Sequence, residues 1–375
     1  MEVARPKISV IIPSYNYGHF LANAINSVLD QQGEGFQAEI IVVDDGSKDN
    51  TGEVAQAFGE AVKYIYQDNQ GLAAARNTGI ENTTGEFVVF LDADDLLPPD
   101  YIKNQLENFR KNEAADISVC HCLLLDLDEK DTTLWPLKAD NLELHLCHSN
   151  IAPVHAFMTR SNAIREAGLF DRGRKACEDY DYWLRLAGLG KRFAVATNTF
   201  AVYRRHASSM TGQVLQQVLS DMSARLEIRK LLESSPGFPG VPKYYGWLAY
   251  AAGTISSSAI IAQGLPKLAR DMVNHSAEAL LEGARYYSQA KACEPHLIQS
   301  ERYYACEYFS HARLYGDEYS STMAKALSFL SSRYPALENA SPGQLQARQS
   351  HLFRNLLAEH DSIESELQKY KLPVA

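Results

Sequence analysis

A run of apolar residues that ends in a cluster of carboxylates constrains the fold of this chain most strongly. The run Phe87–Leu91 is followed at once by Asp92, and Asp94 and Asp95 come directly afterwards. Consecutive apolar residues of this kind indicate a strand that is buried on both faces of a sheet. Carboxylates this close together repel one another, and a divalent cation bound through oxygen ligands would relieve that repulsion. A merely solvated acidic loop is the alternative interpretation.

Two further strand-like runs end in polar residues. Glu39–Val43 is followed by Asp44 and Asp45, and Ile8–Ile12 is followed by the segment PSYN at residues 13–16. Ligands of open α/β sheets bind in the crevice outside the carboxyl ends of the strands. We therefore expect these polar residues and the carboxylates after residue 91 to share one site.

Strand and helix patterns alternate along the chain up to about residue 203. Strands are expected at residues 8–12, 39–43, 62–66, 87–91, 117–125 and 192–195, and helices at 20–31, 51–58, 72–80, 99–112, 161–167 and 178–189. Strands that alternate with helices indicate βαβ units and a largely parallel sheet. Residues 126–174 show a less regular pattern, and 203–210 is expected to be a loop.

The pattern becomes helical beyond residue 210, with Pro and Gly interrupting it at 236–240 and 341–343. We therefore expect an α/β domain over residues 1–210 and an all-α domain, a bundle or a degenerate repeat, over 211–375. Residues 244–266 carry no charge but are rich in Gly, Ser and Thr, which favours a buried helix over a membrane span.

Composition excludes some classes of protein. The net charge of −10 argues against a nucleic-acid partner. The six cysteines form no C-x-x-C pair, and no signal peptide is recognised, so we expect a cytoplasmic protein with reduced thiols. The Cys and His residues at 120–122 and 145–148 match no familiar zinc spacing.

Taken in order, the polar motifs resemble those of the family 2 glycosyltransferases of the GT-A fold. The motifs are PSYN (13–16), VVDDGSKD (42–49), NQGLAAARN (69–77), LDADD (91–95), EDYDYW (178–183) and YRRH (203–206). The resemblance covers roughly the first 210 residues. It implies a Rossmann-like, mostly parallel sheet flanked by helices. It also implies transfer of a hexosyl group, with inversion, from a nucleoside diphosphate sugar, usually UDP-linked, with Mn²⁺ or Mg²⁺ as the cofactor.

The resemblance implies roles at the donor site. Asp94 and His206 would bind the metal, and Asp92 would reach the ribose or the water shell of the metal. The residues expected to bind the nucleotide are Pro13, Tyr15, Asn16, Asp45, Arg76 and Asp92. For Arg76, a contact with the diphosphate and a structural ion pair with Asp44 both stay open. Asp95 is a candidate for supporting the metal ligands.

The resemblance also assigns a catalytic base. An acceptor hydroxyl needs one, because an alcohol that keeps its proton is a poor nucleophile, and Asp179 matches the base of the family. Acidic residues at a helix start also complement the helix dipole, so a capping role for Glu178 and Asp179 is compatible. Glu178 and Trp183 are candidates for acceptor contacts, although core packing is favoured for Trp183. The segments 155–160 and 168–171 resemble the acceptor side, with structural roles favoured.

The expected acceptor is a hydroxyl of a glycan or of a lipid-linked saccharide, in polysaccharide biosynthesis at the cell envelope. The Gln-x-x-Arg-Trp motif of processive synthases is absent, which favours non-processive transfer. Peripheral contact with the inner membrane face, and oligomerisation through the C-terminal helices, are the expected further interactions. The alternative is a catalytically degenerate GT-A protein that serves as a glycan-binding or scaffold module. Haloacid dehalogenase-type phosphatases and nicotinamide-dependent dehydrogenases are disfavoured, the latter because residues 13–18 form no Gly-x-Gly-x-x-Gly turn.

Overall fold

The computed structural model of the protein describes residues 5–31, 35–126, 131–135, 150–174 and 176–206, together with isolated positions between 137 and 146 and between 324 and 344. These residues fall into two compact units. The first holds the α/β part up to His206, and the second includes the short helix α13 (Pro335–Glu338). Most of the predicted all-α domain, including its expected start near residue 211 and the uncharged segment 244–266, lies outside the described residues.

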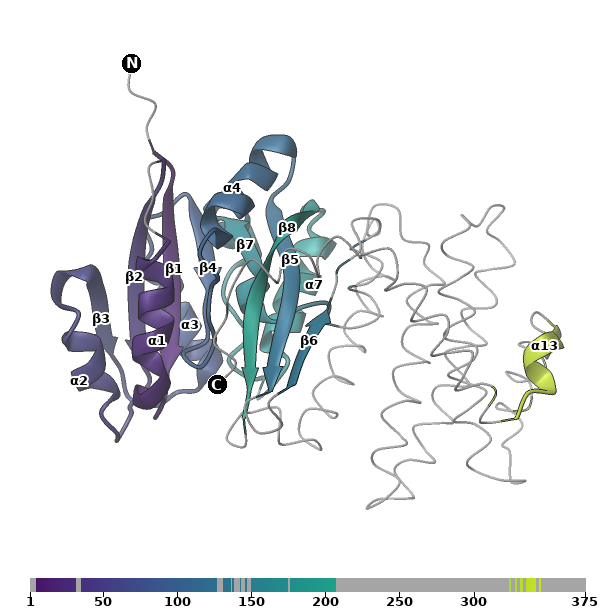
Figure 1. The fold of residues 1–375 in the computed structure, drawn as a ribbon, viewed down its shortest axis with the longest axis horizontal. Helices are drawn as coiled ribbons and strands as arrows, with labels where there is room; N and C mark the ends of the chain where they lie inside the picture. The colour runs from purple at the N-terminus through teal and green to yellow at the C-terminus, as the bar shows by residue number, and fades with distance from the viewer. Residues whose placement is uncertain are drawn as a thin grey trace. The chain divides into compact units, whose positions relative to one another are not determined.

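The α/β unit is built on one mixed sheet (Figure 1). Its strands are β1 (Lys7–Ser14), β2 (Gln37–Asp44), β3 (Val62–Tyr66), β4 (Phe87–Phe90), β5 (Ile117–Asp126), β6 (Asp131–Trp135), β7 (Phe157–Arg160) and β8 (Phe193–Arg205). They follow the order β3-β2-β1-β4-β7-β5-β6, and β8 pairs with β5. The pairs among β1 to β4 and the β5–β8 pair are parallel, whereas β7 runs antiparallel to β4 and β5, and β6 to β5.

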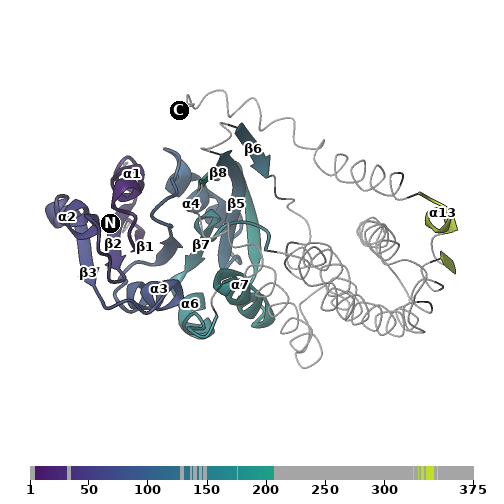
Figure 2. The same ribbon diagram turned by 90° about the horizontal axis from the view of Figure 1, so that it is seen from below.

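Helices cover both faces of this sheet. They are α1 (Gly18–Leu29), α2 (Thr51–Gln56), α3 (Leu72–Glu81), α4 (Tyr101–Lys111), α6 (Ser161–Ala167) and α7 (Glu178–Gly188), with short 3-10 turns η1 (Gly59–Ala61) and η2 (Val154–Ala156). Figure 2 shows α1 on the face opposite to α3, α6 and α7. Among the described residues, no helix combines the length and apolar character needed to cross a bilayer.

The middle residues of the central strands are apolar because both faces of these strands are covered. Val10, Ile11, Val42 and Val89 are completely buried. A Cβ at Gly79 of α3 would lie 2.2 Å from Cγ2 of Ile11, so only glycine lets α3 approach β1 this closely. This packing fixes the C-terminal half of α3 relative to the sheet.

Strand β8 differs from the prediction. The sequence predicted a short strand at 192–195 and a loop from residue 203, but β8 continues to Arg205. Its pairing with β5 shifts register once, between Cys120 and His121, and then resumes. Each residue of β5 that pairs with β8 lies more than seventy positions before its partner, as in Cys120↔Ala196. Local sequence patterns do not predict pairing between residues so far apart. The antiparallel strands β6 and β7 were also not predicted, because both lie in the segment with the irregular pattern.

Candidate active site

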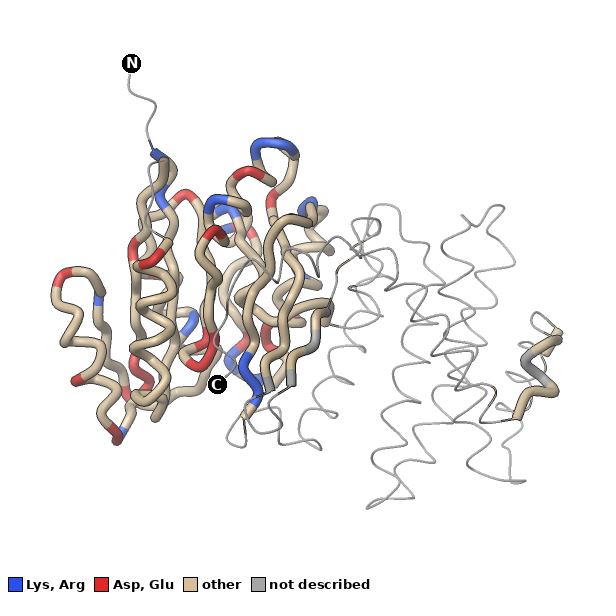
Figure 3. Tube along the Cα trace, in the orientation of Figure 1, with Lys and Arg blue, Asp and Glu red and all other residues tan. Residues whose placement is uncertain are grey.

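The carboxyl ends of β1, β2 and β4 lie side by side, as the sequence predicted. Ser14 pairs with Asp44 in the β1–β2 register, and the Asp45 N–H donates to the Ser14 carbonyl at 2.9 Å. The Leu91 N–H donates to the Ile11 carbonyl at 2.8 Å, which places the acidic motif after β4 at the same edge. Figure 3 shows acidic positions where β4 ends and basic positions where β8 ends, at one edge of the sheet.

The structure brings Asp94 and His206 together, although 112 positions separate them. Oδ2 of Asp94 lies 3.2 Å from Nε2 of His206. Burial raises the pKa of the Asp94 carboxyl above its usual range, and the nearby Asp92 carboxylate raises it further. A divalent cation would reverse both effects, because it favours the ionised carboxylate and accepts imidazole as a second ligand. The two side chains therefore fit the predicted metal-binding role.

A second set of ligand atoms lies beside the first. Asp92, Asp95 and His155 each offer one such atom, and these atoms lie within 4.8 Å of one another. Asp95 and His155 are fully buried. Burial, followed by the charges of Asp94 and Asp92, raises the pKa of Asp95 well above its usual range, and burial lowers the pKa of His155 to about 4. The sequence did not single out His155 as a ligand, because one histidine outside any metal-binding spacing carries no such signal.

Arg76 forms two ion pairs that join distant motifs. Its guanidinium is buried, with Nη2 2.7 Å from Oδ1 of Asp92 and Nη1 2.5 Å from Oε1 of Glu178. The proposed ion pair with Asp44 is wrong. The carboxylate of Asp44 instead accepts the Ser47 N–H at 2.8 Å and the Tyr64 hydroxyl at 2.8 Å.

Asp45 holds the turn that precedes α3. Its buried carboxylate accepts hydrogen bonds from the Gln67 side chain at 2.7 Å and from the N–H groups of Gln70 and Gly71 at 2.9 and 2.8 Å. Gly71 has a φ of 91°, a conformation that glycine adopts easily. A carboxylate offers about four acceptor positions, so one remains for the contact with the nucleotide that the resemblance implies.

The predicted nucleotide-binding residues after β1 differ in exposure. Pro13 is buried, whereas the ring of Tyr15 is 44% exposed and is available for stacking. Asn16 has a φ of 58°, its side-chain oxygen accepts the Lys48 N–H at 2.8 Å, and its own N–H donates to Ser47 at 2.9 Å. Asn16 thus ties the loop after β1 to the loop after β2.

Asp179 lies in the first turn of α7. Its Oδ2 accepts a hydrogen bond from Nδ2 of Asn150 at 2.9 Å. Burial and the neighbouring Glu178 carboxylate raise the pKa of Asp179 to about 6. A base is most effective when its pKa lies near the operating pH, so this environment suits proton abstraction. The sequence could not identify Asn150, which lies outside every recognised motif.

Trp183 is a core residue. Its side chain is fully buried and stacks on Phe157, with 4.1 Å between ring centroids and 17° between planes. The favoured prediction of core packing is confirmed. The alternative, stacking on an acceptor sugar, is wrong because no face of the ring reaches the surface.

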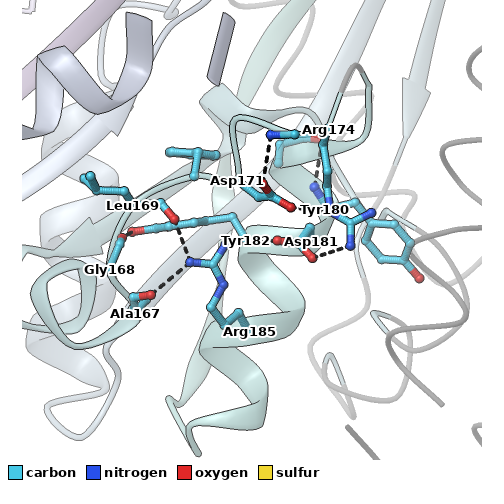
Figure 4. A network of polar contacts seen from close by, with 12 residues as sticks. Ala167, Gly168, Leu169, Asp171, Arg174, Tyr180, Asp181, Tyr182 and Arg185 are labelled. Carbon is cyan, nitrogen blue, oxygen red and sulfur yellow. Dashed lines mark hydrogen bonds and ion pairs between the residues drawn. The ribbon is translucent and has the colours of Figure 1, made fainter. Parts of the chain in front are cut away.

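A polar network fixes the segment that precedes Asp179 (Figure 4). The carboxylate of Asp181 forms two ion pairs. Its Oδ1 lies 2.8 Å from Nη2 of Arg174, and its Oδ2 lies 2.9 Å from Nη2 of Arg185. Arg185 also donates to the carbonyls of Ala167 and Leu169 at 2.9 and 2.6 Å. These contacts hold residues 167–174 against α7.

Comparisons with known proteins identify the family of this chain. Residues 9–143 match the family described as "Glycosyl transferase family 2". An uncharacterized glycosyltransferase of Rickettsia prowazekii is 31% identical over 225 residues, which cover 58% of this chain and 70% of the relative. The chain belongs to glycosyltransferase family 2. An uncharacterized glycosyltransferase of Rickettsia typhi is 35% identical over 188 residues, but the match covers only 58% of its length and 48% of this chain.

Solved structures show that this family 2 glycosyltransferase has the predicted GT-A fold. TarS 1–349 of S. aureus, solved in complex with UDP-GlcNAc, matches with a TM-score of 0.59 and 14% identity, covering 88% of this chain and 92% of the 1–349 chain. A mannosyltransferase of Pyrobaculum calidifontis, solved with GDP-Man and Mn²⁺, matches with a TM-score of 0.54 and 17% identity, covering 90% of this chain and 89% of that structure. At these identities the likeness establishes the fold alone.

Proposed function

We propose that this glycosyltransferase moves a hexosyl group, with inversion, from a nucleoside diphosphate sugar to a hydroxyl of a glycan or lipid-linked saccharide. The proposal depends on one observation: the Arg76 guanidinium bridges Asp92 of the acidic motif and Glu178 beside Asp179. The residues that match a donor site and the residue that matches a base are therefore neighbours. A UDP-linked donor is favoured by the family motifs.

In this proposal Asp94 and His206 hold a divalent cation, with Mn²⁺ and Mg²⁺ as the candidates. The bound cation would stabilise the charge that develops on the diphosphate leaving group. Asp92 lies beside this pair and is partly exposed, so it is placed to meet the ribose. The exposed ring of Tyr15 offers a stacking surface for the base.

Asp179 accepts the proton of the acceptor hydroxyl as the acceptor oxygen forms its bond to the anomeric carbon. The bond between that carbon and the diphosphate oxygen breaks at the same time, so the nucleoside diphosphate leaves with the electron pair. Asn150 stabilises the ionised form of Asp179 and orients its Oδ2. Non-processive transfer remains part of the proposal.

A thermal-shift screen of nucleotides and nucleotide sugars, with and without Mn²⁺, tests the donor assignment. The proposal expects stabilisation by at least one nucleoside diphosphate sugar, and more stabilisation when Mn²⁺ is present. Donors that bind are then tested for release of nucleoside diphosphate in the presence of saccharide acceptors. If no donor stabilises the protein and none releases nucleotide, the scaffold alternative replaces the enzyme.

A further inference from the structure

Asp95 is a fully buried carboxyl that accepts a backbone hydrogen bond. Its Oδ1 accepts the N–H of Arg204 at 2.8 Å, in the last part of β8. Asp is almost never fully buried without a partner, because removing its carboxyl group from water is costly. The role of the Asp95 side chain therefore depends on the part of the backbone that its hydrogen bond with Arg204 holds in place.

The contact lies between the two residues proposed to bind the metal. Asp94 precedes Asp95, and His206 lies two positions beyond Arg204. The same loop and strand are joined by a pair of backbone hydrogen bonds between Leu96 and Val202, each 3.1 Å, and by the Arg204 side chain, which donates to the Asp94 carbonyl. The loop after β4 and the end of β8 are thus held together, and each carries or precedes one of the two residues proposed to bind the metal.

The second oxygen of Asp95 faces a buried histidine. Oδ2 of Asp95 lies 3.2 Å from Nδ1 of His155. The backbone of His155 is itself fixed, because its carbonyl accepts the Tyr101 hydroxyl at 2.8 Å. His155 is thus fixed within contact distance of Asp95, but Oδ2 of Asp95 and Nδ1 of His155 do not form a hydrogen bond.

We propose that Asp95 is a positioning residue that holds the end of β8, through the Arg204 N–H, so that His206 stays beside Asp94. The inference rests on the proposed function, because it concerns the metal site of that function. Asp95 acts through the Arg204 N–H and does not touch the ion. Residues that support metal ligands in this way typically change metal affinity by about 10- to 100-fold when mutated.

Two variants separate positioning from direct coordination. Asp95→Ala removes the acceptor of the Arg204 N–H, so the Kd for Mn²⁺ should rise by about 10- to 100-fold. Asp95→Asn keeps an acceptor oxygen at the same place, so its Kd should stay close to that of the wild type. Electron paramagnetic resonance of free Mn²⁺ gives both constants, and calorimetry with UDP in the presence of chelator shows whether the nucleotide site is intact.

A matched control is Asn108→Ala. Asn108 is also buried, and its side-chain amide donates a hydrogen bond to the Ala194 carbonyl of β8 at 3.2 Å. This contact lies at the opposite end of the strand from His206. Asn108→Ala should lower the melting temperature and leave the Kd for Mn²⁺ unchanged. A folded Asp95→Ala with wild-type Mn²⁺ affinity would overturn the inference.

Asp95→Asn decides the question even if Asp95→Ala does not fold. Loss of Mn²⁺ affinity in the folded Asn variant would mean that the carboxylate charge itself holds the ion, in the set of Asp92, Asp95 and His155. That result would overturn the positioning role and leave the proposed function intact. Failure of the wild type to bind Mn²⁺ with UDP would instead contradict the metal dependence in the proposed function.

Discussion

Nη1 of Arg76 lies 2.5 Å from Oε1 of Glu178, although 102 positions separate the two residues. The same guanidinium holds Asp92 through Nη2. One buried cation therefore balances carboxylates from the motif after β4 and from the first turn of α7. Arg76 is positioned by α3, whose approach to the sheet depends on Gly79.

Arg76→Ala should destabilise the fold. Removing the cation leaves the buried Glu178 carboxylate unpaired, and such a change costs about 3 kcal/mol or more in the free energy of unfolding. Urea denaturation measures it, and the exposed Arg110→Ala serves as the control. A loss smaller than the scatter among surface variants, about 0.5 kcal/mol, would contradict a structural role for this ion pair.

Asp94→Asn should remove the metal-dependent part of nucleotide binding. The amide keeps the size of the side chain but loses the charge that a hard cation requires. Calorimetry with UDP should show that Mn²⁺ strengthens binding to the wild type and no longer does so in the variant. Asp100→Asn, an exposed carboxylate at the start of α4, should behave as the wild type. Equal Mn²⁺ enhancement in the wild type and Asp94→Asn would refute this assignment.

The pH dependence of kcat/KM should report Asp179. Its pKa is raised to about 6, so the base is protonated below that pH and activity should rise as the pH increases through it. The same shift lowers stability in this range: the folded state binds more protons than the unfolded state between about pH 4 and 6, so stability falls as the pH rises.

Asp179→Asn should lose about 10²- to 10⁴-fold in kcat while donor affinity is kept.

Asn150→Ala should move the acidic limb of this profile to higher pH. The Asn150 amide donates to the ionised form of Asp179, so its removal makes ionisation harder. Steady-state rates across the pH range measure the change, and the plateau at high pH should stay near that of the wild type. An unchanged profile would show that the hydrogen bond does not tune the base.

Tyr15→Ala should weaken nucleotide binding without loss of stability. Stacking of a base on an aromatic ring is worth about 1–3 kcal/mol, or about 5- to 150-fold in Kd. Tyr66→Ala is the matched control, because that ring is also exposed, at 58% against 44%, and lies at the end of β3. Equal effects of the two substitutions on UDP affinity would argue against a specific contact with Tyr15.

The parts of the fold that sequence patterns predicted are those in which neighbours along the chain decide the structure. The strands near residues 8, 39 and 87 each contain an apolar run, and their carboxyl ends meet as expected for parallel strands. Strand β8 was only partly predicted, because its pairing with β5 is non-local and its last residues are polar.

For the site, motif resemblance pointed to Asp94, His206 and Asp179, and their roles stay predictions. The ion-pair partner of Arg76 was assigned wrongly. Any of several carboxylates could pair with a buried guanidinium, and only the packing of α3 and α7 selects Glu178. Asn150 and His155 lie in segments without periodic patterns, so no local signal connected them to Asp179 and Asp95.

The distance along the chain between Asp94 and His206 has a consequence for biosynthesis. The acidic cluster leaves the ribosome long before His206, which directly follows β8. Until β8 has been translated and has docked on β5, the nascent polypeptide carries the crowded carboxylates without His206. A chain stalled on the ribosome before that strand would thus lack one of the two residues that we propose to bind the metal.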